Sequence, residues 1–176
     1  ILYFGSSVYG CWLEANQPNI EKANVALYQI DSDTRVKCLP LIMPQRRDKV
    51  TKERIKLLPL ILASTMEVQQ PKEPFRPEYV IPQILTECVL KYNAEQKSDV
   101  ILGIKYLSTK RNSDGNFFSS ERYSYLYENY AFPPIEHKFY GVCSKLSKCF
   151  SLIRSSSIFQ DTYEIEIGRA SCRERV

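Results

Sequence analysis

The chain has 176 residues, of which 44% are apolar and 25% are charged, and its formal net charge is +4. This length suffices for one domain with a real core, and no apolar run approaches the roughly 20 residues that a membrane-spanning helix needs. The small positive charge is too weak to indicate a nucleic-acid partner.

The N-terminal segment predicts a short strand followed by a helix. Ile1–Phe4 is apolar and is expected to be a buried strand. Ser6 or Ser7 suits the N-cap of a helix that runs to about Asn16. This arrangement would place the helix directly after the first strand.

One face of this helix combines small residues with an acid. Ser7, Gly10 and Glu14 follow at i, i+3 and i+7 and therefore share a face. Small residues there would let a ligand or another backbone approach closely. A solvated Glu14 on an exposed helix face is the simpler alternative.

The rest of the chain mixes strands and helices without regular βαβ alternation, which predicts an α+β fold. The basic run at 46–54 is typical of a solvated helix face, with a nucleic-acid patch as the minor alternative. Pro59 is expected to kink or end the helix that follows. The expected elements are strands at 24–30, 36–41, 100–107 and 123–132, helices at 45–62, 81–96 and 142–150, and a ragged strand-like segment at 151–164.

The cysteines argue against a metal site. Six are present, none forms a C-x-x-C pair, and His137 is the only histidine. A zinc site needs such ligands at close spacing, so we expect no metal. Scattered thiols are typical of reduced cysteines in the cytoplasm. A Cys–His nucleophilic pair that uses His137 is a minor alternative.

Residues 166–176, EIGRASCRERV, are set apart from the domain at 1–165. They resemble the translation of a common sequencing adapter, with a natural basic tail as the alternative. We therefore exclude them from the expected fold.

Three separated segments carry chemistry-bearing residues. LYFGSS leads to CWLE with Glu14, GIKYLS ends at Ser108, and NYAFP begins at Asn129; YVIPQ lies between the first two segments. Together and in this order they resemble the RES domain, a family named for an Arg, a Glu and a Ser. Glu14 would be its Glu and Ser108 its Ser. The family's Arg lies upstream of the strand with Tyr3, so the resemblance implies that the chain is incomplete at its N-terminus and binds NAD poorly as it stands.

The resemblance implies an ADP-ribosyltransferase-like fold, a mixed sheet with flanking helices that binds NAD+ as substrate in a cleft. Cleaving the nicotinamide–ribose bond builds positive charge on the ribose, which a carboxylate can oppose. By the resemblance Glu14 is that carboxylate and Tyr3 the aromatic group near nicotinamide. Ser108 would contact the phosphate or ribose, and Asn129 matches an Asn whose role is less clear. The alternatives are structural roles. Tyr3 would then be a tyrosine of a core strand, and Ser108 would be a serine in the turn at the end of a strand.

The function implied is degradation of NAD+ by hydrolysis or phosphorolysis, in a toxin neutralised by a partner antitoxin. The first alternative is ADP-ribosyl transfer to a macromolecule, which would use the same residues. The second is a non-catalytic NAD- or protein-binding module, which a long insert at 110–128 and exposed Tyr123, Tyr125 and Tyr127 would favour. The six glycines form no phosphate-binding loop, so a Rossmann or P-loop fold is disfavoured.

Overall fold

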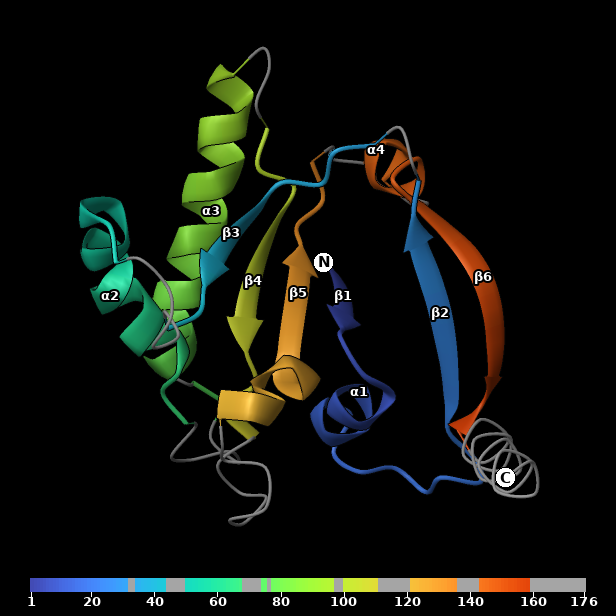
Figure 1. The fold of residues 1–176 in the computed structure, drawn as a ribbon. Coiled ribbons are helices and arrows are strands. Elements are labelled where there is room, and N and C mark those ends of the chain that lie inside the picture. Colours follow the sequence, from blue (N-terminus) through green and yellow to red (C-terminus); the bar gives the residue numbers. More distant parts are fainter. Residues whose placement is uncertain are drawn as a thin grey trace, which may run out of the picture.

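A computed structural model describes residues 1–31, 34–43, 50–67, 74–75, 77–96, 100–110, 121–135 and 143–158. It has the expected α+β composition (Figure 1). His137, most of the insert at 110–128 and the tail at 166–176 lie outside the described residues. The elements are β1 (Leu2–Gly5), α1 (Val8–Glu14), β2 (Asn24–Ile30), β3 (Cys38–Leu41), α2 (Lys52–Ser64), η1 (Pro77–Tyr79), α3 (Val80–Glu95), β4 (Gly103–Leu107), η3 (Glu121–Tyr127), β5 (Glu128–Phe132), α4 (Ser144–Ser147) and β6 (Phe150–Ser157).

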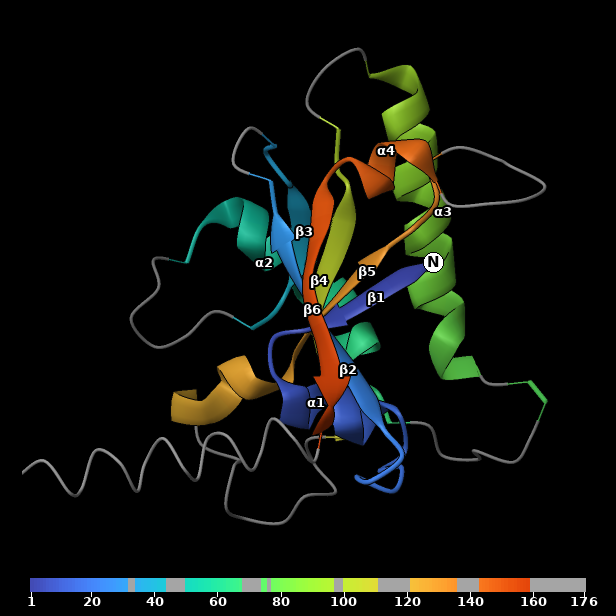
Figure 2. The same ribbon diagram turned by 90° about the vertical axis from the view of Figure 1, so that its right-hand side faces the viewer.

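Four strands form a mixed sheet in the order β1-β5-β4-β3. β5 runs antiparallel to both β1 and β4, whereas β3 and β4 are parallel. β2 and β6 form a separate antiparallel ribbon. Figure 1 shows α2 and α3 next to β3 and β4, with the ribbon on the other side of the molecule, next to β1. The turned view in Figure 2 places β6 and β2 in front of the four strands.

The main core lies between the four-stranded sheet and helices α2 and α3. Leu41 and Ile104 project from β3 and β4, and Ile61 and Val89 meet them from the helices. These side chains are at most 5% exposed. Burying them against one face of the sheet fixes which residues of each strand point toward the helices, because successive side chains alternate between faces.

The opposite face of the sheet packs on the β2–β6 ribbon through aromatic rings. Phe4 and Phe132 lie 5.8 Å apart between ring centroids, and each lies 4.9 Å from Phe150 of β6. Tyr28 of β2 completes the group at 5.2 Å from Phe4. Tilted and edge-on rings at these distances are favourable packing, so this cluster joins the ribbon to the sheet.

The expected strand at 123–132 is wrong in its first half. Residues Glu121–Tyr127 form the 3-10 helix η3, and β5 begins only at Glu128. The reason is a contact with the start of α1, where the Ser6 and Ser7 hydroxyls donate to the carbonyls of Tyr125 and Leu126. A Cβ atom on Gly10 would lie 2.5 Å from the Leu126 oxygen. The small residues of α1 therefore let the backbone of η3 approach closely. The sequence predicted this close approach, of a ligand or of another backbone, as one of two interpretations of that face.

Two further expectations need correction. The first strand is not buried, since Ile1 and Tyr3 are 63% and 61% exposed. β1 is the last strand of its sheet among the described residues, so only one of its edges is covered. The second concerns Pro59, where a kink or an end of the helix is expected: α2 does not end there, because it continues to Ser64, and the kink stays a prediction. Proline removes one backbone donor, but the buried Ile61 beyond it anchors the last turn.

Two helices are shorter than expected. The helix expected at 45–62 begins at Lys52, where the Thr51 hydroxyl accepts from the Arg54 amide at 3.3 Å. The helix expected at 142–150 is the short α4, and β6 follows it directly. Among the described helices, none combines the length and apolar character needed to cross a membrane.

Candidate active site

A cavity of about 330 Å³ opens between the sheet and the helices. Tyr3 of β1, Glu14 of α1 and Tyr106 of β4 line it, and Tyr79 of η1 and Thr86 of α3 lie among the residues of the opposite wall. Small-molecule sites commonly have volumes of about 300–1,000 Å³. The cavity is therefore large enough for a group of about nucleoside size.

Strand register explains why these side chains meet. Tyr3 and Ile104 both pair with Ala131, and Tyr106 pairs with Asn129. Residues that pair across an antiparallel ladder point to the same face of the sheet. All of them therefore face α2 and α3, while Phe4 and its neighbours face the ribbon.

Glu14, Asn129 and Tyr106 form a connected group at this cavity. The Asn129 side-chain amide donates to Glu14 Oε1 at 2.7 Å, and the Tyr106 hydroxyl also bonds to the Asn129 side chain. Asn129 is only 4% exposed. A hydrogen bond to a charged acceptor is stronger than one to a neutral acceptor, so Asn129 holds the Glu14 carboxylate in one orientation.

The protonation of Tyr106 follows from its surroundings. Burial raises the pKa of the Tyr106 phenol, and the nearby Glu14 carboxylate and the Tyr3 and Tyr79 phenols raise that pKa further. The hydrogen bond to Asn129 acts in the opposite direction but does not outweigh them. Tyr106 therefore keeps its proton at neutral pH and can donate a hydrogen bond into the cavity.

The described wall of the cavity is mostly apolar, but all of its charged side chains are acidic and three of its residues are tyrosines. Glu14 and Glu78 supply carboxylates, three tyrosines supply ring surface, and none of the lining residues that the structure describes is a lysine or an arginine. Aromatic faces and carboxylates both attract cations. Such a wall favours a ligand group that carries, or develops, positive charge.

The four residues predicted from the sequence differ in their position relative to the cavity. Tyr3 and Glu14 line the cavity, and Asn129 lies directly behind Glu14. Ser108 does not line it: this residue is 4% exposed, and its hydroxyl accepts from the Lys110 amide at 3.2 Å. The catalytic and binding roles of all four residues stay predictions.

Sequence reasoning missed three of the lining residues that supply carboxylates and tyrosine rings to the cavity. Tyr106 lies two positions after Ile104 in GIKYLS, and strand alternation there would have placed its side chain with the core face. Glu78 and Tyr79 precede α3 in a segment whose local pattern gives no such signal. Their position depends on how α3 packs against the sheet.

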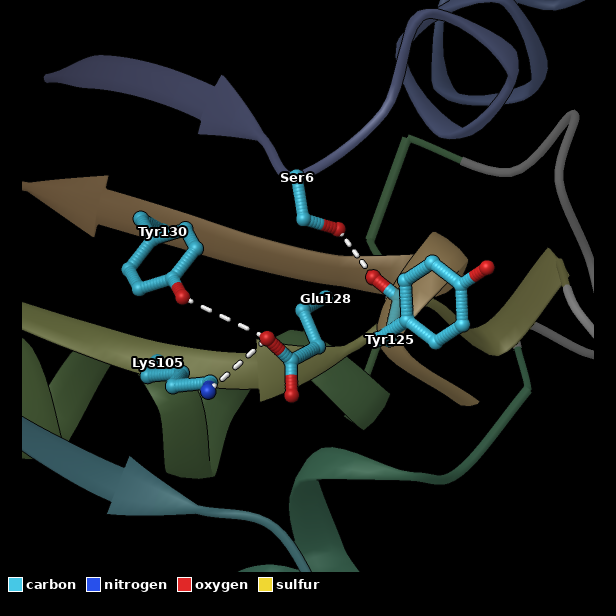
Figure 3. Close-up of polar contacts among 5 residues, drawn as sticks. All are labelled: Ser6, Lys105, Tyr125, Glu128 and Tyr130. Atoms are coloured by element: carbon cyan, nitrogen blue, oxygen red, sulfur yellow. Dashed lines mark hydrogen bonds and ion pairs between the residues drawn. The ribbon is translucent and has the colours of Figure 1, made fainter. Parts of the chain in front are cut away.

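The opposite face of the sheet carries a second polar group, shown in Figure 3. Lys105 Nζ lies 2.8 Å from Glu128 Oε2, which also accepts from the Tyr130 hydroxyl at 3.3 Å. Burial lowers the pKa of Lys105, but the hydrogen bond and charge of Glu128, together with Tyr130, outweigh it and raise that pKa. Lys105 is therefore a charged partner that ties β4 to β5.

Three of the five described thiols do not suggest nucleophiles. Burial raises the pKa of Cys11, Cys38 and Cys149, which keeps these thiols protonated at neutral pH. The five cysteines in the described segments carry no disulfide. Within those segments no three potential metal ligands from His, Cys, Asp and Glu gather at one place.

These shifts together predict loss of stability in alkaline solution. A group whose pKa is raised on folding stabilises the fold below its unfolded pKa and loses that contribution as the pH passes its folded pKa. Cys11, Lys105, Tyr106 and Tyr130 all act in this direction, from an ordinary thiol value of 9.0 upward. We expect the unfolding temperature to fall steadily above about pH 9.

Thermal unfolding measured by circular dichroism from pH 7 to 11 checks this expectation. Tyr106→Phe should flatten the decline, since it removes one of the shifted groups. Tyr125→Phe, at a tyrosine that is 55% exposed, is the matched control. An unfolding temperature that is equal or higher at pH 10.5 than at pH 8 would contradict the expectation.

Comparison with known proteins finds a bacterial relative. The chain is 31% identical, over 179 residues, to a protein of Bacillus subtilis (strain 168) named "Putative toxin YopC". The match covers 93% of this chain but only 38% of the relative's length. No model of a protein family matches the chain, and no solved structure matches it. Over nearly its whole length, therefore, this chain is similar to one part of a longer bacterial protein whose name describes a toxin.

Proposed function

We propose that this chain is the NAD⁺-degrading domain of a toxin and that it cleaves the bond between nicotinamide and ribose. The observation that carries the proposal is the Glu14 carboxylate, oriented by Asn129 at 2.7 Å beside Tyr106 in an acidic, tyrosine-walled cavity. The toxin part is supported by the name of the Bacillus subtilis relative. The NAD⁺ part is supported by the resemblance to the RES domain and by the chemistry of the cavity.

The ground state of the substrate suits this wall. The nicotinamide ring of NAD⁺ is a flat pyridinium that carries a positive charge. Tyrosine faces bind such cations, and Tyr3, Tyr79 and Tyr106 all contribute to the wall. The cavity would thus take the nicotinamide riboside half, with the rest of the dinucleotide outside it.

The transition state suits Glu14. As the C1′–N bond breaks, its electron pair leaves with nicotinamide, which becomes neutral, and positive charge develops on C1′ and the ring oxygen. A fixed carboxylate stabilises that charge more than it stabilises the ground state, which is what accelerates a reaction. Water then forms the new bond to C1′ and loses a proton to solvent. The protonated Tyr106 hydroxyl would orient the substrate as a hydrogen-bond donor.

Water is the acceptor that fits this cavity better than phosphate. Two carboxylates and no basic side chain line the described wall, so an anion would be repelled there.

A neutralising partner protein belongs to the same proposal. We place it at the mouth of the cavity, where Ile1 and Tyr3 are exposed.

Controlled expression in a bacterial host tests the proposal. We expect strong expression of the wild-type chain, which offsets the weak NAD⁺ binding that the resemblance implies, to arrest growth and deplete cellular NAD⁺, whereas Glu14→Gln at the same protein level should do neither. Growth arrest at normal NAD⁺ would contradict the NAD⁺ part alone. Normal growth with normal NAD⁺ would contradict both parts. Labelled ADP-ribose on macromolecules would favour the transferase alternative.

A further inference from the structure

The end of α1 carries an unusual polar contact. The Lys110 ammonium donates to the carbonyls of Leu13 and Glu14 at 3.0 and 2.8 Å and to Asn16 Oδ1 at 2.7 Å. An ammonium has three N–H donors, and it can therefore serve three such acceptors at once. One of the bonds reaches the carbonyl of Glu14, one of the last helix carbonyls, which lack a partner within the helix, and another reaches the Leu13 carbonyl, which also accepts from the Asn16 amide. A cation at a helix C-terminus is also favoured by the helix dipole.

The chain just beyond α1 needs such support. Asn16 and Gln17 have φ angles of 64° and 53°, in the left-handed region that side chains rarely adopt. Their amides bond back to Leu13 and Trp12, and the Trp12 indole donates to the Pro18 carbonyl at 2.8 Å. The turn is therefore closed on itself on one side and held by Lys110 on the other.

Ser108 in turn fixes the position of Lys110. The Ser108 hydroxyl accepts from the Lys110 amide, and the Ser108 amide donates to the Tyr127 carbonyl at 2.9 Å. Ser108 directly follows β4, so the turn is fixed to the strand that carries Tyr106. The cavity wall and the end of α1 are thus connected through two residues.

We propose that Ser108 and Lys110 are positioning residues, which hold Glu14 in register with Asn129 and Tyr106 by anchoring the last turn of α1. The positioning role rests on the proposed function only in the experiment that measures turnover. It gives the buried Ser108 a role behind the cavity, in place of the ligand contact that the resemblance implies. Glu14 is the last residue of the seven-residue helix α1, so its side chain depends on that turn more than on the rest of the helix.

Lys110→Met tests this role, because it removes the charge and the three bonds but keeps most of the apolar stem. We expect kcat for nicotinamide release to fall by up to about 100-fold, since small misplacements cost this much, while KM changes little. Lys110→Arg should recover most of the loss, and Ser108→Ala should show a smaller loss. Lys105→Met is the matched control, because its ammonium pairs with Glu128 on the other face of the sheet, and its kcat should equal that of the wild type.

A second readout does not depend on turnover. The Asn129 side-chain amide protons, observed by NMR, should exchange with solvent faster in Lys110→Met and Ser108→Ala but not in Lys105→Met. If the wild type releases no nicotinamide, the proposed function fails and this readout still decides the positioning role. Unchanged exchange in both variants, with kcat as in Lys105→Met where turnover exists, would overturn the inference. If Lys110→Met does not fold, Ser108→Ala carries the test.

Discussion

Replacing Glu14 with glutamine is expected to lower the rate of nicotinamide release by about 100- to 1,000-fold, the usual cost of removing one electrostatic stabiliser of a transition state. The substitution keeps the side chain's shape, and its remaining oxygen can still accept from Asn129, which lies 2.7 Å away. The loss should appear in kcat rather than in KM, because the carboxylate matters most when charge develops on the ribose. Steady-state kinetics with NAD⁺ measures both constants.

A matched variant separates the position of Glu14 from its charge. Glu87→Gln makes the same chemical change on an exposed part of α3 and should leave both constants unchanged. Glu14→Gln must also unfold at the wild-type temperature for the comparison to hold. Equal rates for the two variants would remove Glu14 from the reaction.

Asn129→Ala is expected to impair both stability and turnover. The substitution removes the donor to Glu14 and the partner of Tyr106. Leaving buried polar groups unsatisfied costs about 1–3 kcal/mol of unfolding free energy. Because the Glu14 carboxylate also loses its orientation, we expect nicotinamide release to fall by roughly 10- to 100-fold. Urea unfolding and steady-state kinetics on the same preparation check both effects.

Asn93→Ala is the matched control for that experiment. Asn93 is also buried, and its side chain bonds to the amide and carbonyl of Ile101 at 2.9 and 2.7 Å, away from the cavity. We expect a similar loss of stability with full turnover at temperatures where the variant is folded. If both variants lose turnover in proportion to stability, Asn129 has no special role in the site.

The sequence pattern predicted best those helices and strands whose structure depends mainly on their own residues. The strand at 24–30 and the helix at 81–96 were predicted nearly to the residue from alternation and helical spacing, although no residue of β2 is buried and only Val89 and Asn93 are buried in α3. Glu14 and Asn129 were selected from separate motifs, and the structure brings them into contact. Such a pairing follows from the β1–β5 register, which short motifs do not specify.

Long-range contacts account for the failures. The alternating tyrosines at 123–127 have the pattern of a strand, but the hydroxyls of Ser6 and Ser7 donate to the carbonyls of Tyr125 and Leu126, and the segment forms a 3-10 helix. That helix also buries Tyr127 completely, edge-on to Tyr9 at 6.1 Å, so only part of the expected exposed tyrosine surface exists. The Lys110 contact at the end of α1 spans about as much of the chain, and no local pattern marks it.

Proton NMR of the purified chain, incubated with NAD⁺ and, in parallel, with nicotinamide riboside, tests directly whether Glu14 and its cavity cleave the bond between nicotinamide and ribose. The riboside lacks the pyrophosphate, so its cleavage depends only on the cavity that Glu14, Tyr3 and Tyr106 line. We expect free nicotinamide from the riboside and, from NAD⁺, nicotinamide with unphosphorylated ADP-ribose even in phosphate buffer. If neither compound releases nicotinamide, the proposed function is wrong.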